Sequence, residues 1–253
     1  MRRLARDLTL VRRAFRNWRS VASAGLLWRH LPLPRRELTV VTRGGTRIAV
    51  PLGRAAGALY PVLEVFAFSE YAFDWRLEDD PCIVDVGAHV GAFTLWLAER
   101  YPSLRAVCFE PDPEAYRYLE RNTQRIAATL QRRAVGASSG TAMLRRPIAG
   151  GGISTLRTAA HGDDVAVEVV SLEQVLAPLA DVSLLKLDCE GSEYELVLDT
   201  PDGCWGRVRR VVLEYHPLPE REPSSLVDRL GSVGLRLVRA EPKNGVGTYW
   251  FSR

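Results

Sequence analysis

Acidic side chains stand at or near the ends of several short apolar runs in this 253-residue chain. Asp85 lies in the run CIVDVG, Glu110 ends the run AVCFE, and Asp188 ends the run VSLLKLD. Carboxylates can bind hydroxyl groups, accept protons or hold a cation. They can act together only if the fold brings the ends of these runs to one place.

Strand–helix alternation from residue 81 onward predicts such a fold. Its nearly continuous apolar strands indicate a mostly parallel sheet that is covered by helices on both faces. Capping boxes at Ser171 with Gln174, and at Ser192 with Glu195, predict two helix starts. Strands are predicted at 82–87, 106–110, 132–136, 165–171, 182–188 and 210–215, with a closing antiparallel pair at 235–241 and 247–253. Ligands of such sheets collect beyond the carboxyl ends of the strands, so the acids are expected at one edge.

A glycine turn follows the first of these strands. In DVGAHVG (85–91), Gly87 allows a sharp turn and Gly91 allows the next helix to pack closely. The spacing differs from the GxGxxG that holds a dinucleotide pyrophosphate, so the ligand need not carry phosphate. Glu110 follows at the end of the second strand, where an acid can accept hydrogen bonds from both ribose hydroxyls. We assign the structural role, capping the helix that runs to about residue 127, to Asp112.

A second group of acids follows the strand 182–188. Asp188 is not needed by any helix cap, whereas Glu193 has a structural explanation as an acid in the first turn of the next helix. His216 directly follows the strand 210–215, and histidine suits proton transfer near neutral pH. Asp188 is therefore our first candidate for a general base, with Glu190 and His216 as alternatives.

These segments together resemble the FkbM-type methyltransferases, which use S-adenosylmethionine. The resemblance rests on VDVGAHVGAFTL (84–95), FEPDP (109–113), GGISTL (151–156), SLEQVL (171–176), LKLDCEGSEYELV (185–197) and LEYH (213–216), in family order. It implies an α/β fold with a Rossmann-like seven-stranded methyltransferase sheet, mostly parallel with an antiparallel last strand. The expected organisation is an Arg-rich amphipathic helical arm (1–36), a hairpin and helix prelude (37–80) and the S-adenosylmethionine-binding core (81–253).

The resemblance also implies the chemistry. The expected reaction transfers the methyl group of S-adenosylmethionine to a hydroxyl of a sugar, natural product or other small metabolite. Asp188, Glu190 and His216 are the expected catalytic residues. The residues implied in cofactor binding are Asp85, Gly87, Ala88, His89, Gly91, Glu110 and Asp188.

Other assignments of the same acids stay open at this point. Asp188, Glu190 and Glu214 could hold a divalent metal that lowers the pKa of the acceptor hydroxyl, but their spacing is not diagnostic and we expect no metal. A nucleic-acid methyltransferase would suit the basic arm, yet the chain has no (D/N)PP(Y/F) segment. A non-catalytic scaffold that retains the cofactor fold is a further alternative. A nicotinamide-dependent oxidoreductase is disfavoured because GxGxxG is missing.

The N-terminal 36 residues carry ten Arg and one Asp, although the whole chain has a net charge of only +4. The basic character therefore belongs to this arm. Its apolar residues recur at helical spacing, which predicts one amphipathic helix with a single apolar face. Those residues are Leu4, Leu8, Val11, Phe15 and Trp18. We expect this face to pack on the chain's own core or on a second copy, with weak contact to a membrane surface as an alternative and nucleic acid as a less favoured one.

The remaining features concern the prelude and the compartment. A hairpin is predicted over 39–53 with its turn at Gly44-Gly45, followed by a helix over 58–73. The four cysteines are scattered and form no CxxC pair, which favours a reducing, cytoplasmic environment. No apolar run approaches the roughly 20 residues that a membrane span needs.

Overall fold

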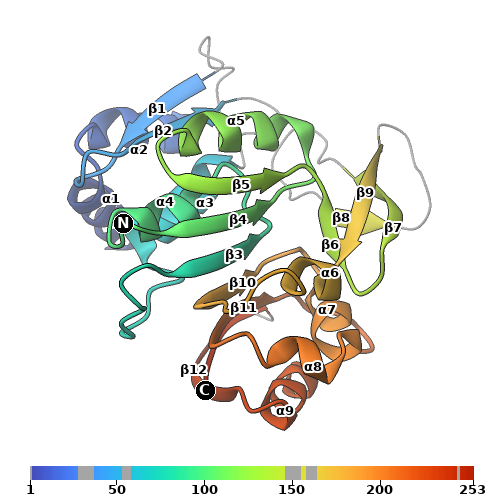
Figure 1. Cartoon of the computed structure of the whole chain (residues 1–253). Helices are drawn as coiled ribbons and strands as arrows, with labels where there is room; N and C mark the ends of the chain where they lie inside the picture. Colours follow the sequence, from blue (N-terminus) through green and yellow to red (C-terminus); the bar gives the residue numbers. More distant parts are fainter. Residues whose placement is uncertain (1, 28–36, 53–57, 146–154, 158–163, 244–245) are drawn as a thin grey trace.

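The structure is a computed structural model that describes residues 2–27, 37–52, 58–145, 155–157, 164–243 and 246–253 (Figure 1). Its helices are α1 (Arg2–Ala14), α2 (Trp18–Leu27), α3 (Leu59–Leu63), the π-helical η2 (Glu64–Phe68), α4 (Ala92–Ala98), α5 (Pro113–Thr123), α6 (Leu172–Leu176), α7 (Glu193–Asp199), α8 (Asp202–Trp205) and α9 (Ser224–Ser232). Its strands are β1 (Glu37–Val41), β2 (Arg47–Pro51), β3 (Cys82–Val86), β4 (Arg105–Phe109), β5 (Ala127–Gln131), β6 (Ala134–Gly136), β7 (Gly140–Arg145), β8 (Thr155–Arg157), β9 (Val165–Ser171), β10 (Leu184–Leu187), β11 (Arg210–Tyr215), β12 (Arg236–Lys243) and β13 (Val246–Ser252).

A seven-stranded sheet of order β12-β13-β11-β10-β3-β4-β5 forms the centre of the fold. The pairs from β11 through β10, β3 and β4 to β5 are parallel. β13 runs antiparallel to both of its neighbours, β11 and β12. The predicted Rossmann-like sheet with an antiparallel last strand is therefore confirmed, and β10, β3 and β4 lie side by side with their carboxyl ends at one edge.

Each face of this sheet carries its own hydrophobic core. Successive residues of β3 point to opposite sides, so Ile83 packs with one core and Val84 with the other. The first core includes side chains of α1 to α5 and η2, and the second includes side chains of α6 to α9. Burial on both faces explains why the central strands are apolar nearly throughout.

The N-terminal arm packs on the chain itself. Val11 and Phe15 are buried in the first core, as the packing interpretation predicted. The prediction of a single helix is wrong, because the helix is interrupted between α1 and α2. Asn17 causes the break: its side-chain amide donates to the carbonyl oxygen of Thr39 and accepts from the N–H of Val41, both in β1. Among the described residues, no helix is both long and apolar enough to cross a membrane.

Two predictions about the middle of the chain are also wrong. The predicted strand 132–136 forms only in part, as β6 at Ala134–Gly136, and belongs to a smaller sheet. The third strand of the large sheet in chain order is instead β5, at Ala127–Gln131, where the sequence predicted the end of a helix; α5 already ends at Thr123. β5 lies at the edge of the sheet and is partly exposed, so it carries no continuous apolar run. The predicted strand 165–171 forms, as β9, but belongs to a separate sheet of order β6-β9-β7-β8. The Gly-rich segment 149–152 lies outside the described residues.

The prelude follows its prediction in part. β1 and β2 form the predicted antiparallel hairpin, with Gly45 at φ +101° in the turn. The predicted helix over 58–73 is shorter: α3 passes into the π-helical η2, which ends at Ser69 with φ +58°. The chain that follows is therefore not helical, and it carries Tyr71 to the edge of the large sheet where the acids lie.

Candidate functional site

The glycine turn after β3 is held against the end of β10. Gly87 has φ +76°, and a Cβ built there would lie 1.9 Å from the carbonyl oxygen of Asp188, so no other residue fits. Gly91 has φ +87°, and its Cβ would lie 3.0 Å from Leu119 of α5. The N–H groups of Gly87 and Ala88 both donate to the carbonyl oxygen of Phe109. The turn is thereby fixed to the ends of both neighbouring strands.

Glu110 binds this turn through its side chain. One carboxylate oxygen accepts from the N–H of His89 at 2.8 Å and the other from the N–H of Asp112 at 2.8 Å. Each oxygen keeps a further lone pair, so the carboxylate can still accept hydrogen bonds from a ligand. Burial raises the pKa of Glu110 to about 7, against the effect of these two hydrogen bonds. Asp112 caps α5 as predicted, accepting from the N–H groups of Glu114 and Ala115.

His89 has an unsatisfied atom at this position. It has φ +51°, and its Nδ1 is buried with no hydrogen-bond partner in the described structure. Burial lowers its pKa to about 4, so the imidazole is neutral at physiological pH. A buried polar atom without a partner is costly. A ligand beside the glycine turn could supply the missing hydrogen bond.

Lys186 connects the turn to the strand ends beneath it. It lies opposite Asp85 in the β10–β3 pairing and is 3% exposed. Its ammonium donates to the carbonyl oxygen of Gly87 and lies 3.4 Å from Asp85 and 3.2 Å from Asp188. Burial by itself would lower the pKa of Lys186, but the two acids outweigh it and raise that pKa. The fully buried Asp85 also accepts from the hydroxyl of Thr94 at 2.7 Å.

Tyr71 joins two acids from different strands. Its hydroxyl lies 2.9 Å from Oδ2 of Asp188 and also contacts Oε2 of Glu214. A tyrosine hydroxyl has one proton to donate, so one of these contacts needs a proton from the acid. Burial and the charge of Asp188 raise the pKa of Glu214 to about 7, which makes Glu214 the acid that holds this proton. Burial would also raise the pKa of Asp188, but Lys186 and His216 outweigh it and hold that pKa below its usual value.

His216 lies between two further acids. Its Nε2 is 3.2 Å from Oε2 of Glu190, and its Nδ1 is 3.2 Å from Oε1 of Glu193. Burial by itself would lower the pKa of His216, but the hydrogen bond and charge of Glu193 raise it to about 9. Burial and the charge of Asp188 raise the pKa of Glu190 to about 8.

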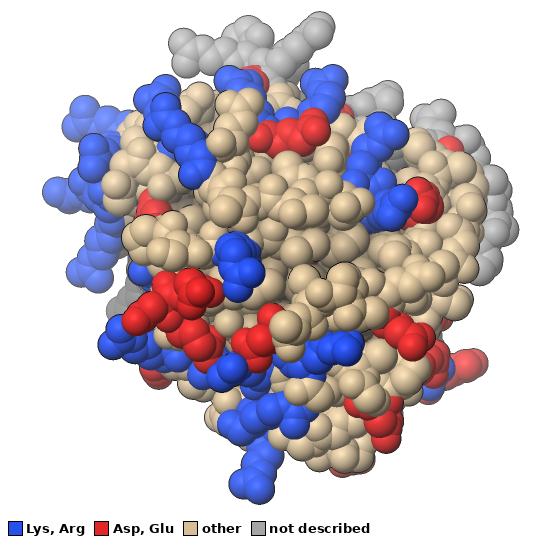
Figure 2. Space-filling model, viewed as in Figure 1, with Lys and Arg blue, Asp and Glu red and all other residues tan. Residues whose placement is uncertain are grey.

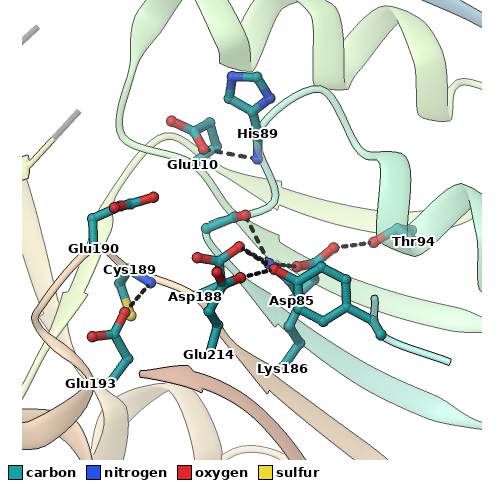
Figure 3. A network of polar contacts seen from close by, with 12 residues as sticks. Asp85, His89, Thr94, Glu110, Lys186, Asp188, Cys189, Glu190, Glu193 and Glu214 are labelled. Atoms are coloured by element: carbon teal, nitrogen blue, oxygen red, sulfur yellow. Dashed lines mark hydrogen bonds and ion pairs between the residues drawn. The ribbon is translucent and has the colours of Figure 1, made fainter. Parts of the chain in front are cut away.

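Figure 3 shows the candidate site around Asp188, with His89 and Glu110 on one side and Glu190 and Glu193 on another. All predicted site residues lie on the turns that follow β3, β4, β10 and β11, except Asp85, which is inside β3. Sequence reasoning assigned Glu193 only a structural role and did not single out Tyr71 as a residue of the site. It also placed a capping box at Ser192, whose side chain caps nothing.

The predicted metal alternative does not match the geometry. The group whose ligand atoms converge, within 4.8 Å of one another, is Asp188, Glu193 and His216, and not Asp188, Glu190 and Glu214. A cation there would have to displace His216 from Glu193 and lie close to the buried ammonium of Lys186. We therefore assign no metal ligands in this site.

Residues 85–233, more than half of the chain, match the family described as the methyltransferase FkbM domain. The chain belongs to the FkbM methyltransferase family. The match spans the glycine turn, Glu110 and the whole Asp188–His216 cluster, which are the parts of the molecule that meet at the sheet edge. S-Adenosylmethionine, the methyl donor of this family, is the cofactor of this chain.

Individual relatives of the chain support the family assignment. The chain is 30% identical over 184 residues to methyltransferase sdnD of Sordaria araneosa, covering 58% of this chain and 71% of that protein. It is 27% identical to the 31-O-demethyl-FK506 methyltransferase FkbM of Streptomyces tacrolimicus, covering 56% and 67%. It is also 27% identical over 220 residues to the AMB antimetabolite synthetase AmbE of Pseudomonas aeruginosa, covering 69% of this chain but only 10% of that much longer protein.

The fold has a counterpart among solved structures. The crystal structure of methyltransferase FkbM from Methylobacillus flagellatus KT superposes with a TM-score of 0.50 over 92% of this chain. It is 14% identical, and this chain covers 59% of it. The likeness shows a common fold.

Proposed function

We propose that this protein is an S-adenosylmethionine-dependent O-methyltransferase that acts on a hydroxyl of a small molecule such as a sugar or natural product. The observation that carries the proposal is the meeting, at one sheet edge, of the Gly87 turn with its bound Glu110 and the acidic cluster around Asp188. The Gly87 turn with Glu110 can bind an adenosine-containing cofactor, and the acidic cluster can receive a proton.

On the cofactor side, the residues with open hydrogen-bonding capacity lie around the turn. Glu110 has lone pairs for both ribose hydroxyls, and the neutral His89 has its unpartnered Nδ1. Gly87, Ala88 and Gly91 shape the backbone that the cofactor lies against. Asp85 is fully buried beneath the turn, so we propose that it supports the turn through Lys186 and Thr94 without touching the cofactor.

S-Adenosylmethionine supplies a methyl group on a good leaving group, a positively charged sulfur. The chain must then align the acceptor oxygen in line with the carbon–sulfur bond and take up its proton. Five carboxyl groups lie close to the expected reaction centre, together with two cations, Lys186 and the protonated His216. These acids are Asp85, Asp188, Glu190, Glu193 and Glu214. The acids among them that are ionised favour the positive charge of the methyl donor.

Asp188 is already bound by two neighbouring side chains. Its Oδ2 is bonded by both Lys186 and Tyr71, and its pKa is lowered. A carboxylate that is stabilised in its charged form is a poor proton acceptor but a good hydrogen-bond acceptor. We therefore propose that Asp188 orients the acceptor hydroxyl.

Two observations support a small hydroxylated acceptor over nucleic acid. One curated relative is named for 31-O-demethyl-FK506. The edge of the sheet that holds the site is rich in acids, and these would repel a phosphate backbone. A non-catalytic scaffold would have no reason to keep Asp188, Glu190 and Glu214 together at one sheet edge, because bringing carboxyl groups together costs stability unless they are paired.

For the arginine face of the N-terminal arm we propose a separate partner, an anionic membrane surface. Arg6, Arg12, Arg13, Arg16 and Arg19 are exposed, and none pairs with a carboxylate among the described residues. Figure 2 shows basic side chains gathered over the side of the molecule where α1 and α2 lie. With Val11 and Phe15 packed inward, such contact would be electrostatic and weak.

The activity is tested by incubating the purified chain with S-adenosylmethionine carrying a tritiated methyl group and a panel of hydroxylated small molecules. The proposal predicts transfer of label to an oxygen of at least one class of acceptor, and its loss in the Glu110→Ala variant. Label transferred to RNA or DNA in place of the panel would contradict the proposed acceptor. Binding of the donor without transfer to any acceptor, including nucleic acids, would favour a scaffold.

A further inference from the structure

The loop between β10 and α7 has an unusual conformation at its acidic residue. Glu190 has φ +57°, in the left-handed region that residues with a side chain rarely adopt. The residues on both sides of it are fixed by one carboxylate. Oε1 of Glu193 accepts from the N–H of Cys189 at 2.7 Å, and Oε2 accepts from the N–H of Gly191 at 2.8 Å. Backbone strain of this kind persists where the surroundings enforce it, commonly at functional sites.

Glu193 has a third contact that links this loop to β11. Its Oε1 lies 3.2 Å from Nδ1 of His216, and the opposite ring nitrogen lies 3.2 Å from Oε2 of Glu190. Glu190, His216 and Glu193 thus form a closed ring, in which Glu193 holds both the backbone beside Glu190 and the imidazole that binds its side chain. The Glu193 side chain is fully buried, so its contacts with the chain itself are the ones that matter.

We propose that Glu193 is a positioning residue that holds His216 and the Glu190 loop so that Glu190 receives the proton of the acceptor hydroxyl. This proposal rests on the proposed methyl transfer. In the step, the acceptor oxygen bonds to the methyl carbon while the carbon–sulfur bond breaks with its electron pair left on sulfur. The hydroxyl proton passes to Oε1 of Glu190, which enters the step as the carboxylate. The products are a methyl ether, S-adenosylhomocysteine and protonated Glu190.

The geometry favours Glu190 over its neighbours for this step. Oε2 of Glu190 is paired with His216, which leaves Oε1 for the acceptor, and the side chain is 16% exposed. Asp188 is held by Lys186 and Tyr71, and Glu193 has both oxygens bonded to backbone N–H groups. Charged groups that face Glu190 are Asp188, Glu193, Glu214 and His216. Burial and Asp188 make Glu190 more basic than an ordinary carboxylate, which suits a proton acceptor.

The ring is tested by the titration of His216 in the full chain, which needs no acceptor. Histidine labelled with ¹³C and ¹⁵N reports four residues, and the His216→Gln spectrum identifies the signal of His216. We expect His216 to titrate near pH 9 and Glu193→Gln to lower its midpoint by at least one pH unit. Glu190→Gln is expected to lower it as well. Glu195→Gln is the matched control: the same residue type on the same helix, exposed, and expected to leave the midpoint unchanged.

The catalytic part is tested with the fastest acceptor of the labelled-donor panel. Glu190→Gln and Glu193→Gln are expected to lower kcat at least tenfold with an unchanged Kd for S-adenosylmethionine, whereas Glu195→Gln stays within twofold. A His216 midpoint near that of a free histidine, or full kcat in Glu190→Gln, would overturn the inference while leaving the methyltransferase intact. If wild type neither binds nor uses the donor, the proposed function fails, whatever the titration shows.

Discussion

At the scale of single residues, the site depends on acids whose protonation is set by burial and by their neighbours. Glu110 and Asp188 were predictable, because each follows an apolar strand of a parallel sheet whose strand ends must meet. Tyr71 and Glu193 were harder to predict. Tyr71 reaches Asp188 across 117 residues of sequence, and Glu193 has the position of an ordinary first-turn acid. Nothing in a single sequence reveals that the two carboxylate oxygens of Glu193 accept hydrogen bonds from the backbone of the preceding loop.

The pKa of Glu110 predicts how cofactor binding depends on pH. Ribose hydroxyls donate to an ionised carboxylate, and burial raises the pKa of Glu110 to about 7. Affinity for S-adenosylmethionine should therefore rise as pH increases through 7, by up to about tenfold per pH unit below the pKa. Calorimetric titrations at pH 6, 7 and 8 measure this. Glu110→Gln should bind more weakly and with little pH dependence; an equally steep profile in that variant would assign the effect to another group.

Tyr71 is expected to contribute to stability through its hydroxyl. Tyr71→Phe removes the hydrogen bonds to Asp188 and Glu214 and leaves two partly buried acids facing each other. We expect a loss of about 1–3 kcal/mol in the free energy of unfolding. Urea denaturation measures it, with Tyr116→Phe, a partly exposed tyrosine, as the control. Equal stability of the two variants would show that the Tyr71 hydroxyl contributes nothing measurable.

At the scale of elements, the site exists because turns after β3, β4, β10 and β11 pack against one another. Hydrophobic patterning predicted these strands well, since buried strands leave clear apolar runs. It failed at β5, a partly exposed edge strand, and at η2, where a π-helical turn ends the helix early. It also failed between α1 and α2, where a side-chain contact to a distant strand interrupts a helical pattern.

The turn after β3 approaches the end of β10 closely at Gly87. A Cβ there would lie 1.9 Å from the Asp188 carbonyl oxygen and would push the β3 turn away from β10. Gly87→Ala should therefore abolish S-adenosylmethionine binding and lower stability by more than about 3 kcal/mol. Gly140→Ala, where nothing lies within 4 Å of the added Cβ, is the control and should keep both. Normal cofactor affinity in Gly87→Ala would mean that the turn tolerates movement.

At the scale of the whole molecule, charge is divided between a basic arm and an acidic sheet edge. The arm packs through Val11 and Phe15 into the same core as α3, α4 and α5, so it is part of the folded molecule. The sequence predicted this packing from the spacing of the apolar residues. What the arginines bind was not predictable, because anionic lipids and nucleic acids attract them in the same way.

The proposed membrane contact predicts salt-sensitive binding to anionic vesicles. In co-sedimentation with vesicles of phosphatidylglycerol and phosphatidylcholine, the double variant Arg12→Glu/Arg13→Glu should bind at least tenfold more weakly than wild type, since each basic residue near such a surface contributes about 1 kcal/mol. Arg125→Glu/Arg132→Glu makes the same change in net charge at exposed positions outside the arm. Equal loss in both double variants would point to net charge and not to the arm.

The central claim is that the Gly87 turn and Glu110 bind S-adenosylmethionine. Isothermal titration of the purified chain with this cofactor and, separately, with NAD tests it most directly, in wild type and in Glu110→Ala. Our account predicts micromolar binding of S-adenosylmethionine, a loss of that binding in Glu110→Ala, and no binding of NAD. Binding of NAD, or donor affinity that is unchanged in Glu110→Ala, would contradict it.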